Sequence, residues 1–303
     1  MNVTYEDVRK SEEIRTYIKQ ADESLKAIGY TEHSFAHCTK VAKVAGDLLE
    51  KLGYDAHEVE LARIAGFMHD IGNVVNRIDH AQSGAMMAFR ILDKMGMPPE
   101  DVATVITAIG NHDEQTAAAV NAVAAALIIA DKTDVRRSRV RNRSTINFDI
   151  HDRVNYAAEK SDVILEPDSK TITLDLKINT EICAVMDYFE IFTGRMLLCR
   201  KAAEFLGLQF KLDIRDDTVV SVVLQGSSAQ LQSGTKLLVR HEALTVKHGA
   251  VVHHGTFKIV NHSVEVVHDV VHPLAVSCHY FIAHSCLVLL LILTLPGLLA
   301  ALD

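Results

Sequence analysis

The chain has 303 residues, of which 49% are hydrophobic and 23% are charged, a composition ordinary for a folded soluble protein with a sizeable core. Its formal net charge of -8 at pH 7 argues against nucleic-acid binding through the surface as a whole. An anionic substrate would therefore need a local group of cationic side chains.

The cysteines and the N-terminal residues both indicate in which cellular compartment the protein is expected. The number of cysteines, five, is odd, and no two have CxxC spacing, which disfavours a disulfide framework and a zinc ribbon. They are Cys38, Cys183, Cys199, Cys278 and Cys286. Residues 1–20 alternate in charge where a signal peptide needs an uninterrupted apolar stretch. We therefore expect a cytoplasmic protein.

Apolar residues recur every three or four positions through the first half of the chain, which predicts a stack of amphipathic helices. Examples are Ile14, Ile18 and Leu25, and then Val41, Val44, Ala45, Leu48 and Leu49. Thr31 and Ser34 in TEHS are typical of a helix start, and Gly53 is typical of a helix end. Similar patterns predict helices over about 56–71, 81–95, 99–110 and 119–134.

The pattern changes near residue 144. The segment SDVILEPDSKTITLDLKI predicts two strands around a Pro-Asp-Ser turn, and a helix is expected from about Glu181 to Phe205. Residues 208–214 and 219–224 have the pattern of further strands. The predicted fold class is mainly α, with a helical domain over 1–143 and a small α+β appendage, a hairpin plus a helix, over 144–213.

Residues 214–303 have a different composition. Nine of the sixteen histidines fall between His241 and His284, and the chain ends in CLVLLLILTLPGLLAALD. The apolar run at 286–301 is about as long as the shortest membrane-spanning helices, roughly 17 residues, but Pro296 and the lack of flanking basic residues disfavour a membrane segment. A membrane anchor and a poorly packed extension both stay open for this tail.

Metal-ligating residue types gather in the helical domain. They are His33, His37, His69, Asp70, His80, His112 and Asp131. Imidazole and carboxylate groups suit manganese, iron, nickel, cobalt or zinc. Asp70 and Asp131 each follow an apolar helical run, and a buried carboxylate needs a cation or hydrogen-bond donors to offset its desolvation. The two oxygens of Asp70 could bridge two metal ions, so we expect one shared inward-facing site.

Each of these residues also has an alternative interpretation. A single histidine in a helical protein is usually a surface or core residue without a metal, which applies to His33, His57 and His151 taken one at a time. Asp131 alone could be an ordinary carboxylate at a helix end. Asn111-His112-Asp113 could be a plain turn, because Gly110-Asn111 is turn chemistry. The group of residues favours a metal site more strongly than any single member does.

The order of these residues resembles the HD-domain metal-dependent phosphohydrolases. Their pattern is a His, then a His-Asp pair, then an Asp on consecutive helices. Here it is matched by His37 in AHCTKVA, by His69-Asp70 in FMHDIGN and by Asp131 in IIADKTD. The resemblance implies a helical fold, bound divalent metal and hydrolysis of a phosphorylated substrate.

Two further histidines extend the resemblance to the HD-GYP cyclic-dinucleotide phosphodiesterases and the HD-type diadenosine tetraphosphate hydrolases. They are His80 in DHAQSGA and His112 in IGNHDE. The implied centre holds two metal ions, one on His37, His69, Asp70 and Asp131 and the other on Asp70, His80 and His112. His33 stands where some HD-GYP proteins place a ligand to a third metal. The family's HDIGK lysine is Asn73 here and no GYP-type sequence follows, which weakens the case for a cyclic-di-GMP enzyme.

The implied reaction uses water activated by two metal ions, with Asp70 as the bridging catalytic residue. The segment DKTDVRRSRVRNR adds cations after the last ligand, and we expect Lys132 and Arg136 to bind substrate phosphate, with Asp134 holding one of the arginines. Continuation of the helix would place Arg136, Arg139 and Arg143 on one face. A solvated basic stretch is the alternative.

Three hypotheses for function follow from these patterns. The leading one is a metal-dependent phosphohydrolase acting on a nucleotide or a small phosphorylated metabolite. The second is a catalytically silent metal- or nucleotide-binding regulatory module, for which Asn73 is the hint. The third is a membrane-tethered signalling protein anchored through 286–301. The substrate, the native metal and the oligomeric state are not determined by the sequence.

Overall fold

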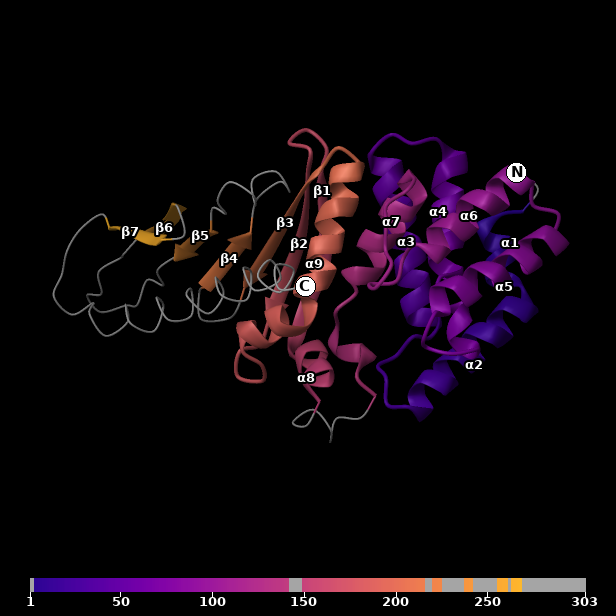
Figure 1. The fold of residues 1–303 in the computed structure, drawn as a ribbon, viewed down its shortest axis with the longest axis horizontal. Helices are drawn as coiled ribbons and strands as arrows, with labels where there is room; N and C mark the ends of the chain where they lie inside the picture. Colours follow the sequence, from indigo (N-terminus) through magenta and orange to yellow (C-terminus); the bar gives the residue numbers. More distant parts are fainter. Residues whose placement is uncertain are drawn as a thin grey trace, which may run out of the picture.

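The structure is a computed structural model that describes residues 3–141, 149–215, 220–224, 237–241, 255–260 and 263–268. A helical bundle formed by the first half of the chain lies beside a smaller part built from a β-sheet and two helices (Figure 1). The described part is therefore mainly helical, as predicted.

The helical bundle follows the predicted order of elements. It consists of α1 (Tyr5–Lys10), α2 (Glu12–Ala27), α3 (Phe35–Lys51), α4 (Ala56–Met68), the 3-10 helix η1 (Ile71–Val74), α5 (His80–Lys94), α6 (Pro99–Gly110) and α7 (Ala122–Lys132). A further 3-10 helix, η2 (Arg137–Arg139), ends this part of the chain. The helix expected over 119–134 is thus three residues shorter at its start and two at its end.

Local capping explains where these helices begin and end. Ser34 caps α3, because its hydroxyl accepts a hydrogen bond from the amide of Ala36, which confirms the predicted start. Gly53 has a φ of 82° just after α3, a left-handed conformation that glycine adopts without a steric cost. Asp55 then caps α4 by accepting from the amides of His57 and Glu58.

Helix α7 lies at the centre of the bundle. Its residues from Val123 to Ala130 are all buried, and it packs against α3, α4, α6 and α9. A helix surrounded on every side has no polar face, which explains why AVAAALII lacks amphipathic spacing. Its small alanine side chains let the neighbouring helices approach closely, so α7 carries Asp131 to a fixed position at its end.

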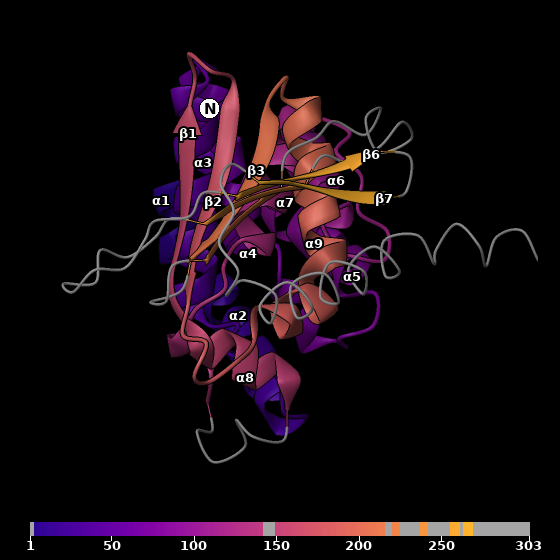
Figure 2. The same cartoon turned by 90° about the vertical axis from the view of Figure 1, so that its left-hand side faces the viewer.

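The smaller part begins with α8 (Ile150–Ala157) and the hairpin of β1 (Ala158–Glu166) and β2 (Thr171–Ile178), followed by α9 (Val185–Phe205) and β3 (Gln209–Arg215). Strands β1 and β2 are antiparallel, whereas β3 pairs in parallel with β2, so α9 is the crossover between them. Helix α9 packs against β3 and α7 and lies between the sheet and the bundle (Figures 1 and 2).

Further strands extend the sheet. The order of the strands is β1-β2-β3-β4-β5, with β4 at Val220–Leu224 and β5 at Leu237–His241. A separate two-stranded sheet is made of β6 (Gly255–Val260) and β7 (Ser263–His268). The predicted hairpin, the helix near 181–205 and the strands near 208–214 and 219–224 are confirmed, and α8 is an element that the sequence analysis missed.

The apolar run at 286–301 lies outside the described residues. Within the part of the chain that the structure describes, no helix combines the length and the apolar character that crossing a membrane requires. Most of the tail assigned to 214–303 is likewise outside the described ranges.

Glycine packing yields a prediction for stability. A Cβ on Gly66 of α4 would stand 2.7 Å from the Cα of Ala42 on α3, whereas a Cβ on Gly194 of α9 would meet no atom within 4 Å. Gly66→Ala should therefore lower the free energy of unfolding by about 1–3 kcal/mol, because backbone must shift to admit the methyl group. Gly194→Ala, the matched control, should raise it by about 1 kcal/mol through helix propensity. Urea denaturation measures both, and equal effects would contradict the close packing of α3 on α4.

Candidate metal centre

Helix ends bring the predicted ligands together. His37 lies in the first turn of α3, His69 caps the end of α4, and Asp70 immediately follows it. His80 is the first residue of α5, while His112 follows the end of α6 and Asp131 lies in the last turn of α7. Residues that are distant in sequence therefore converge where five helices start or stop.

Four of these residues form one cluster around an oxygen of Asp70. The Oδ2 atom of Asp70 lies 3.5 Å from Nε2 of His37 and 3.3 Å from Nε2 of His69. The Oδ1 atom of Asp131 lies 3.4 Å and 3.6 Å from the same two nitrogens. The two imidazole nitrogens are 3.2 Å apart. This arrangement has the donor types and spacing of a metal site.

The other oxygen of Asp70 faces a second cluster. Its Oδ1 atom lies 3.5 Å from Nε2 of His80, which in turn is 3.2 Å from Nε2 of His112. Ligand atoms of Asp70, His80 and His112 all lie within 4.8 Å of one another, as do those of His37, His69 and Asp70. Asp70 is therefore shared by the two clusters, and each of its oxygens faces a different one.

Hydrogen bonds at Nδ1 fix how each imidazole is presented. His37 donates from Nδ1 to Asp134 at 2.8 Å, and His69 donates to the carbonyl of Gly66 at 2.8 Å. The corresponding acceptors are the carbonyl of Arg77 for His80, at 3.0 Å, and that of Ile109 for His112, at 2.6 Å. A proton on Nδ1 leaves the lone pair on Nε2, so all four rings turn a coordinating nitrogen toward the centre.

The charge of Asp70 is incompletely compensated by the protein. Asn73 donates from Nδ2 to Oδ1 of Asp70 at 2.8 Å. The Oδ2 atom is buried and has no hydrogen-bond partner among the described residues. A buried carboxylate oxygen without a donor is costly unless a cation lies beside it. Together with four convergent imidazole nitrogens and no thiolate, this orphaned oxygen fits a divalent transition metal.

The pKa values of the histidines differ between the two clusters. Burial alone would lower the pKa of His69, but the carboxylates of Asp70 and Asp131 outweigh it and raise that pKa to about 10. Burial lowers the pKa of His80 and holds that of His112 well below its usual range. Without metal, a proton on His69 therefore offsets part of the negative charge of the first cluster, whereas His80 and His112 stay neutral and turn their lone pairs toward each other.

Asp134 is the charged group behind the first cluster. Its side chain is fully buried, and its carboxylate accepts from His37, from Lys40 at 2.9 Å and from Nε of Arg136 at 2.9 Å. Burial alone would raise the pKa of Asp134, but the hydrogen bond from His37 and the nearby cations hold it well below its usual range. Asp134 thus orients the His37 ring and makes its nitrogen a better donor to a cation.

The remaining predicted residues occupy different places. His33 lines the cavity in front of the centre, 5.5 Å from His37 between ring centroids, but it belongs to none of the metal-capable groups among the described residues. Lys132 is buried, with Nζ 2.7 Å from Asp131, and lines the same cavity. Arg136 does not line it and instead pairs with Asp134 and Glu32.

The helix after Asp131 does not continue as the sequence analysis supposed. Helix α7 ends at Lys132, and the chain turns before η2, so Arg136 and Arg139 do not share a face of a continued helix. Arg143 lies outside the described residues. Arg139 instead turns inward, where it lines the cavity and donates to the carbonyls of Glu32 and Asp134.

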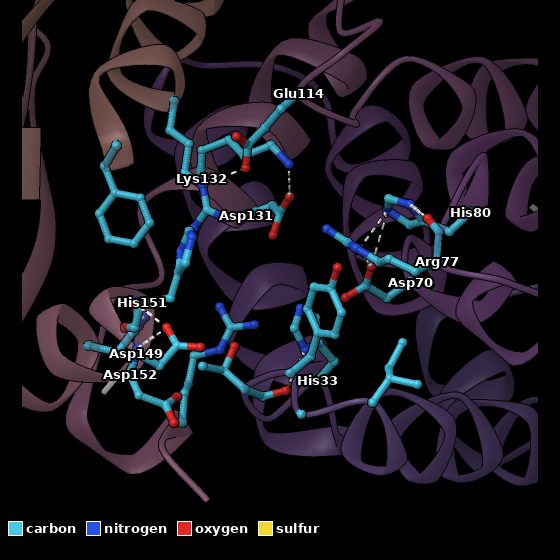
Figure 3. Close-up of a pocket in the computed structure, with 18 residues that line it drawn as sticks. His33, Asp70, Arg77, His80, Glu114, Asp131, Lys132, Asp149, His151 and Asp152 are labelled. Carbon is cyan, nitrogen blue, oxygen red and sulfur yellow. Dashed lines mark hydrogen bonds and ion pairs between the residues drawn. The ribbon is translucent and has the colours of Figure 1, made fainter. Parts of the chain in front are cut away.

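The cavity has a volume of about 300 Å³ and is bounded by both parts of the fold. Figure 3 shows Asp70, Arg77 and His80 on one side and Asp149, His151 and Asp152 of the appendage on the other. Cavity residues that sequence reasoning missed include Arg77 and Glu114 of the bundle and Arg195 of α9. Arg77 follows the HDIG segment closely enough to have been noticed, whereas no local signal marks Arg195.

Comparison with known proteins identifies the helical part. The family description "HD domain" matches residues 34–139, which contain His37, His69, Asp70 and Asp131. Residues 34–139 of the chain therefore form an HD domain.

Individual relatives share parts of the chain. Ribonuclease Y of Latilactobacillus sakei is 31% identical over 121 residues, which are 39% of this chain and 21% of that protein. An uncharacterized protein of Methanocaldococcus jannaschii is 25% identical over 200 residues, 58% of this chain and 76% of that protein. The chain thus spans about a fifth of ribonuclease Y.

A solved structure is also similar in part. It is a predicted HD superfamily hydrolase from an uncultured Thermotogales bacterium, with 27% identity and a TM-score of 0.33. The match covers 41% of this chain and 67% of that one.

Metal affinity should depend on pH through His69. Because its pKa is about 10 in the metal-free protein, an incoming metal must displace its proton, and affinity should rise about tenfold per pH unit up to that value. Calorimetry in buffers of different ionisation enthalpy should detect about one released proton. His80 and His112, whose pKa values are lowered, should release none. Affinity that does not change with pH would contradict the charge balance assigned to the first cluster.

Removing the charge of Asp134 should weaken metal binding. Asp134→Asn should reduce metal affinity about 10- to 100-fold, because His37 loses the carboxylate that orients it. Asp101→Asn is the matched control, since Asp101 is also buried and accepts from Nε2 of His57 at 2.6 Å away from the cavity. Titration with a competing chelator measures both variants. An equal loss of affinity in the control would show that the effect is only structural.

Proposed function

We propose that the protein is a phosphohydrolase that cleaves a phosphoester or phosphoanhydride bond in a nucleotide or a small phosphorylated metabolite by means of a two-metal centre. The observation that carries the proposal is the carboxylate of Asp70, whose two oxygens face different histidines, His37 and His69 on one side and His80 on the other. A carboxylate placed in this way is suited to bridging two cations. The HD domain match over 34–139 supports hydrolytic chemistry at the same residues.

In this proposal His37, His69 and Asp131 hold one metal, His80 and His112 hold the other, and Asp70 holds both. Metal ions held by these residues would activate water as a nucleophile near neutral pH and would supply positive charge for phosphate oxygens. Manganese, iron, nickel, cobalt and zinc all suit this donor set. The surrounding helices exclude bulk water from the ligands, because His37, His69 and His112 are buried.

Lys132 is the cation of this proposal that lies beside the first cluster. Its ammonium group is buried, contacts Asp131 and lines the cavity, so it can offset charge that develops on a phosphoryl group. Arg136, proposed from the sequence as a second phosphate ligand, pairs with Asp134 and lies outside the cavity lining. We therefore assign Arg136 a positioning role, in which it holds Asp134 behind His37.

The cavity also has a second cation near the HD pair. Arg77 donates from Nη1 to Nε2 of His80 at 3.3 Å and lies 4.0 Å from Oδ1 of Asp70. Asn73, which replaces the family's lysine, accepts from the same guanidinium at 3.4 Å. Arg77 thus places positive charge near the second cluster, at a point from which it can turn toward a phosphate in the cavity.

The test combines metal content with turnover. Wild-type protein should bind two manganese ions per chain and hydrolyse a chromogenic aryl phosphate, whereas Asp70→Ala should retain fewer metal ions and lose turnover about a thousandfold or more. His80→Ala should bind one metal ion. Asp168→Ala, an exposed residue of the β-hairpin, is the control. Elemental analysis and initial rates measure these quantities, with circular dichroism to confirm folding.

The same experiment separates the competing hypotheses. Hydrolysis is screened over mononucleotides, dinucleoside polyphosphates, cyclic dinucleotides and an RNA oligonucleotide, the last because the chain is similar to ribonuclease Y over 121 residues. Two bound metal ions without turnover across this panel would favour the silent regulatory module. Metal-free protein, or unchanged metal content and activity in Asp70→Ala, would overturn the proposed function.

A further inference from the structure

The cavity wall formed by α9 lies outside the HD domain match. That match ends at residue 139, yet Arg195 of α9 lines the cavity together with Lys132 and Asp131. The appendage therefore brings a positive charge to the cavity in front of the metal centre from a different part of the fold. The HD domain match therefore assigns no role to Arg195.

Two contacts hold the Arg195 guanidinium in a fixed position. Its Cζ atom lies 4.4 Å from the ring centroid of Phe192, one helical turn earlier. Phe192 is fully buried and packs edge to face with Tyr188, at 5.1 Å between centroids. At its side, Nε of Arg195 is paired with Glu114, on the loop between α6 and α7. A stacked and paired guanidinium loses little further freedom when it binds a ligand.

The remaining nitrogens of Arg195 are available to a ligand. Only Nε engages Glu114, and within residues 3–141 and 149–215 neither Nη1 nor Nη2 has a hydrogen-bond partner. The side chain is 24% exposed and borders the cavity. Adjacent N–H groups of a planar guanidinium match the oxygens of a phosphoryl group in bidentate fashion.

The surroundings place Arg195 close to the metal centre. Its partner Glu114 is two residues after His112. Helix α9, which carries Arg195, packs directly against α7, which carries Asp131 and Lys132. Figure 3 shows Glu114 and Lys132 together above Asp131, across the cavity from Asp70 and His80. Arg195 thus belongs to the wall that faces the second cluster.

We propose that Arg195 of α9 is a substrate-binding residue that holds a phosphoryl oxyanion of the substrate in the cavity between the HD domain and the appendage. This inference rests on the proposed function only in placing a phosphorylated ligand in that cavity. The oxyanion belongs either to the phosphate held at the metals or to a second phosphate of the same substrate. The alternative is that the pair of Arg195 and Glu114 only fastens α9 to the bundle.

Binding probes that are not hydrolysed test the inference without turnover. Inorganic phosphate and methylenediphosphonate are titrated into the manganese-loaded full chain by calorimetry. Arg195→Gln should weaken binding of at least one probe about tenfold or more, the loss expected for a charge-assisted hydrogen bond. Weaker binding of both probes assigns Arg195 to the phosphate at the metals, and weaker binding of the diphosphonate alone assigns it to a second phosphate.

Two further variants separate binding from docking. Arg153→Gln removes the ion pair that joins Arg153 of α8 to Asp187 of α9 at 3.1 Å, outside the cavity lining, and should leave both affinities unchanged. Glu114→Gln breaks the ion pair with Arg195 but keeps the Arg195 cation. The melting temperature of this variant should therefore fall as much as that of Arg195→Gln, whereas its probe affinity should fall less. Arg195→Lys should restore part of the binding.

The inference is overturned if Arg195→Gln binds both probes as wild type does, because Arg195 would then act only as a docking residue. Equal losses of probe affinity in Arg195→Gln and Glu114→Gln would also overturn the inference, because the loss would then follow from breaking the ion pair and not from removing the cation. A wild-type protein that binds the probes through Arg195 but hydrolyses no substrate would refute the proposed function and leave the oxyanion site intact.

Discussion

The burial of the Asp70 carboxylate among apolar helices is the constraint on which the rest of the structure depends. An ionised carboxylate removed from water needs compensating charge or hydrogen-bond donors. Asn73 donates to one oxygen, and the other has no donor among the described residues. The imidazoles gathered around both oxygens therefore have a physical reason to be there, because a cation held by them offsets the cost of burying Asp70.

Helix ends contribute to this balance in two ways. Helices α4, α6 and α7 all finish at the centre, and the negative end of each helix dipole favours a cation there. The last carbonyls of a helix also lack intrahelical donors. Those of Gly66 and Ile109 are used here to accept from the Nδ1 atoms of His69 and His112. The same unpaired groups that end the helices thus orient the imidazoles.

Much of the bundle and of the central cluster could be predicted from sequence because the signals are local. Three- and four-residue spacing locates the helices, and a carboxylate directly after an apolar run, as in His69-Asp70, indicates a buried polar site. The conformation of the basic segment that follows Asp131 could not be predicted, because it depends on where α7 ends, at Lys132. Arg195 could not be predicted either, since its place in the cavity wall depends on how α9 packs against α7.

The position of α9 also has a consequence for the order of folding. Strands β2 and β3 are parallel, so α9 is secured on the sheet only after β3 has paired with β2. During synthesis the bundle emerges before α9. The histidine clusters can therefore assemble first, and the wall that carries Arg195 closes over an HD domain that is already formed.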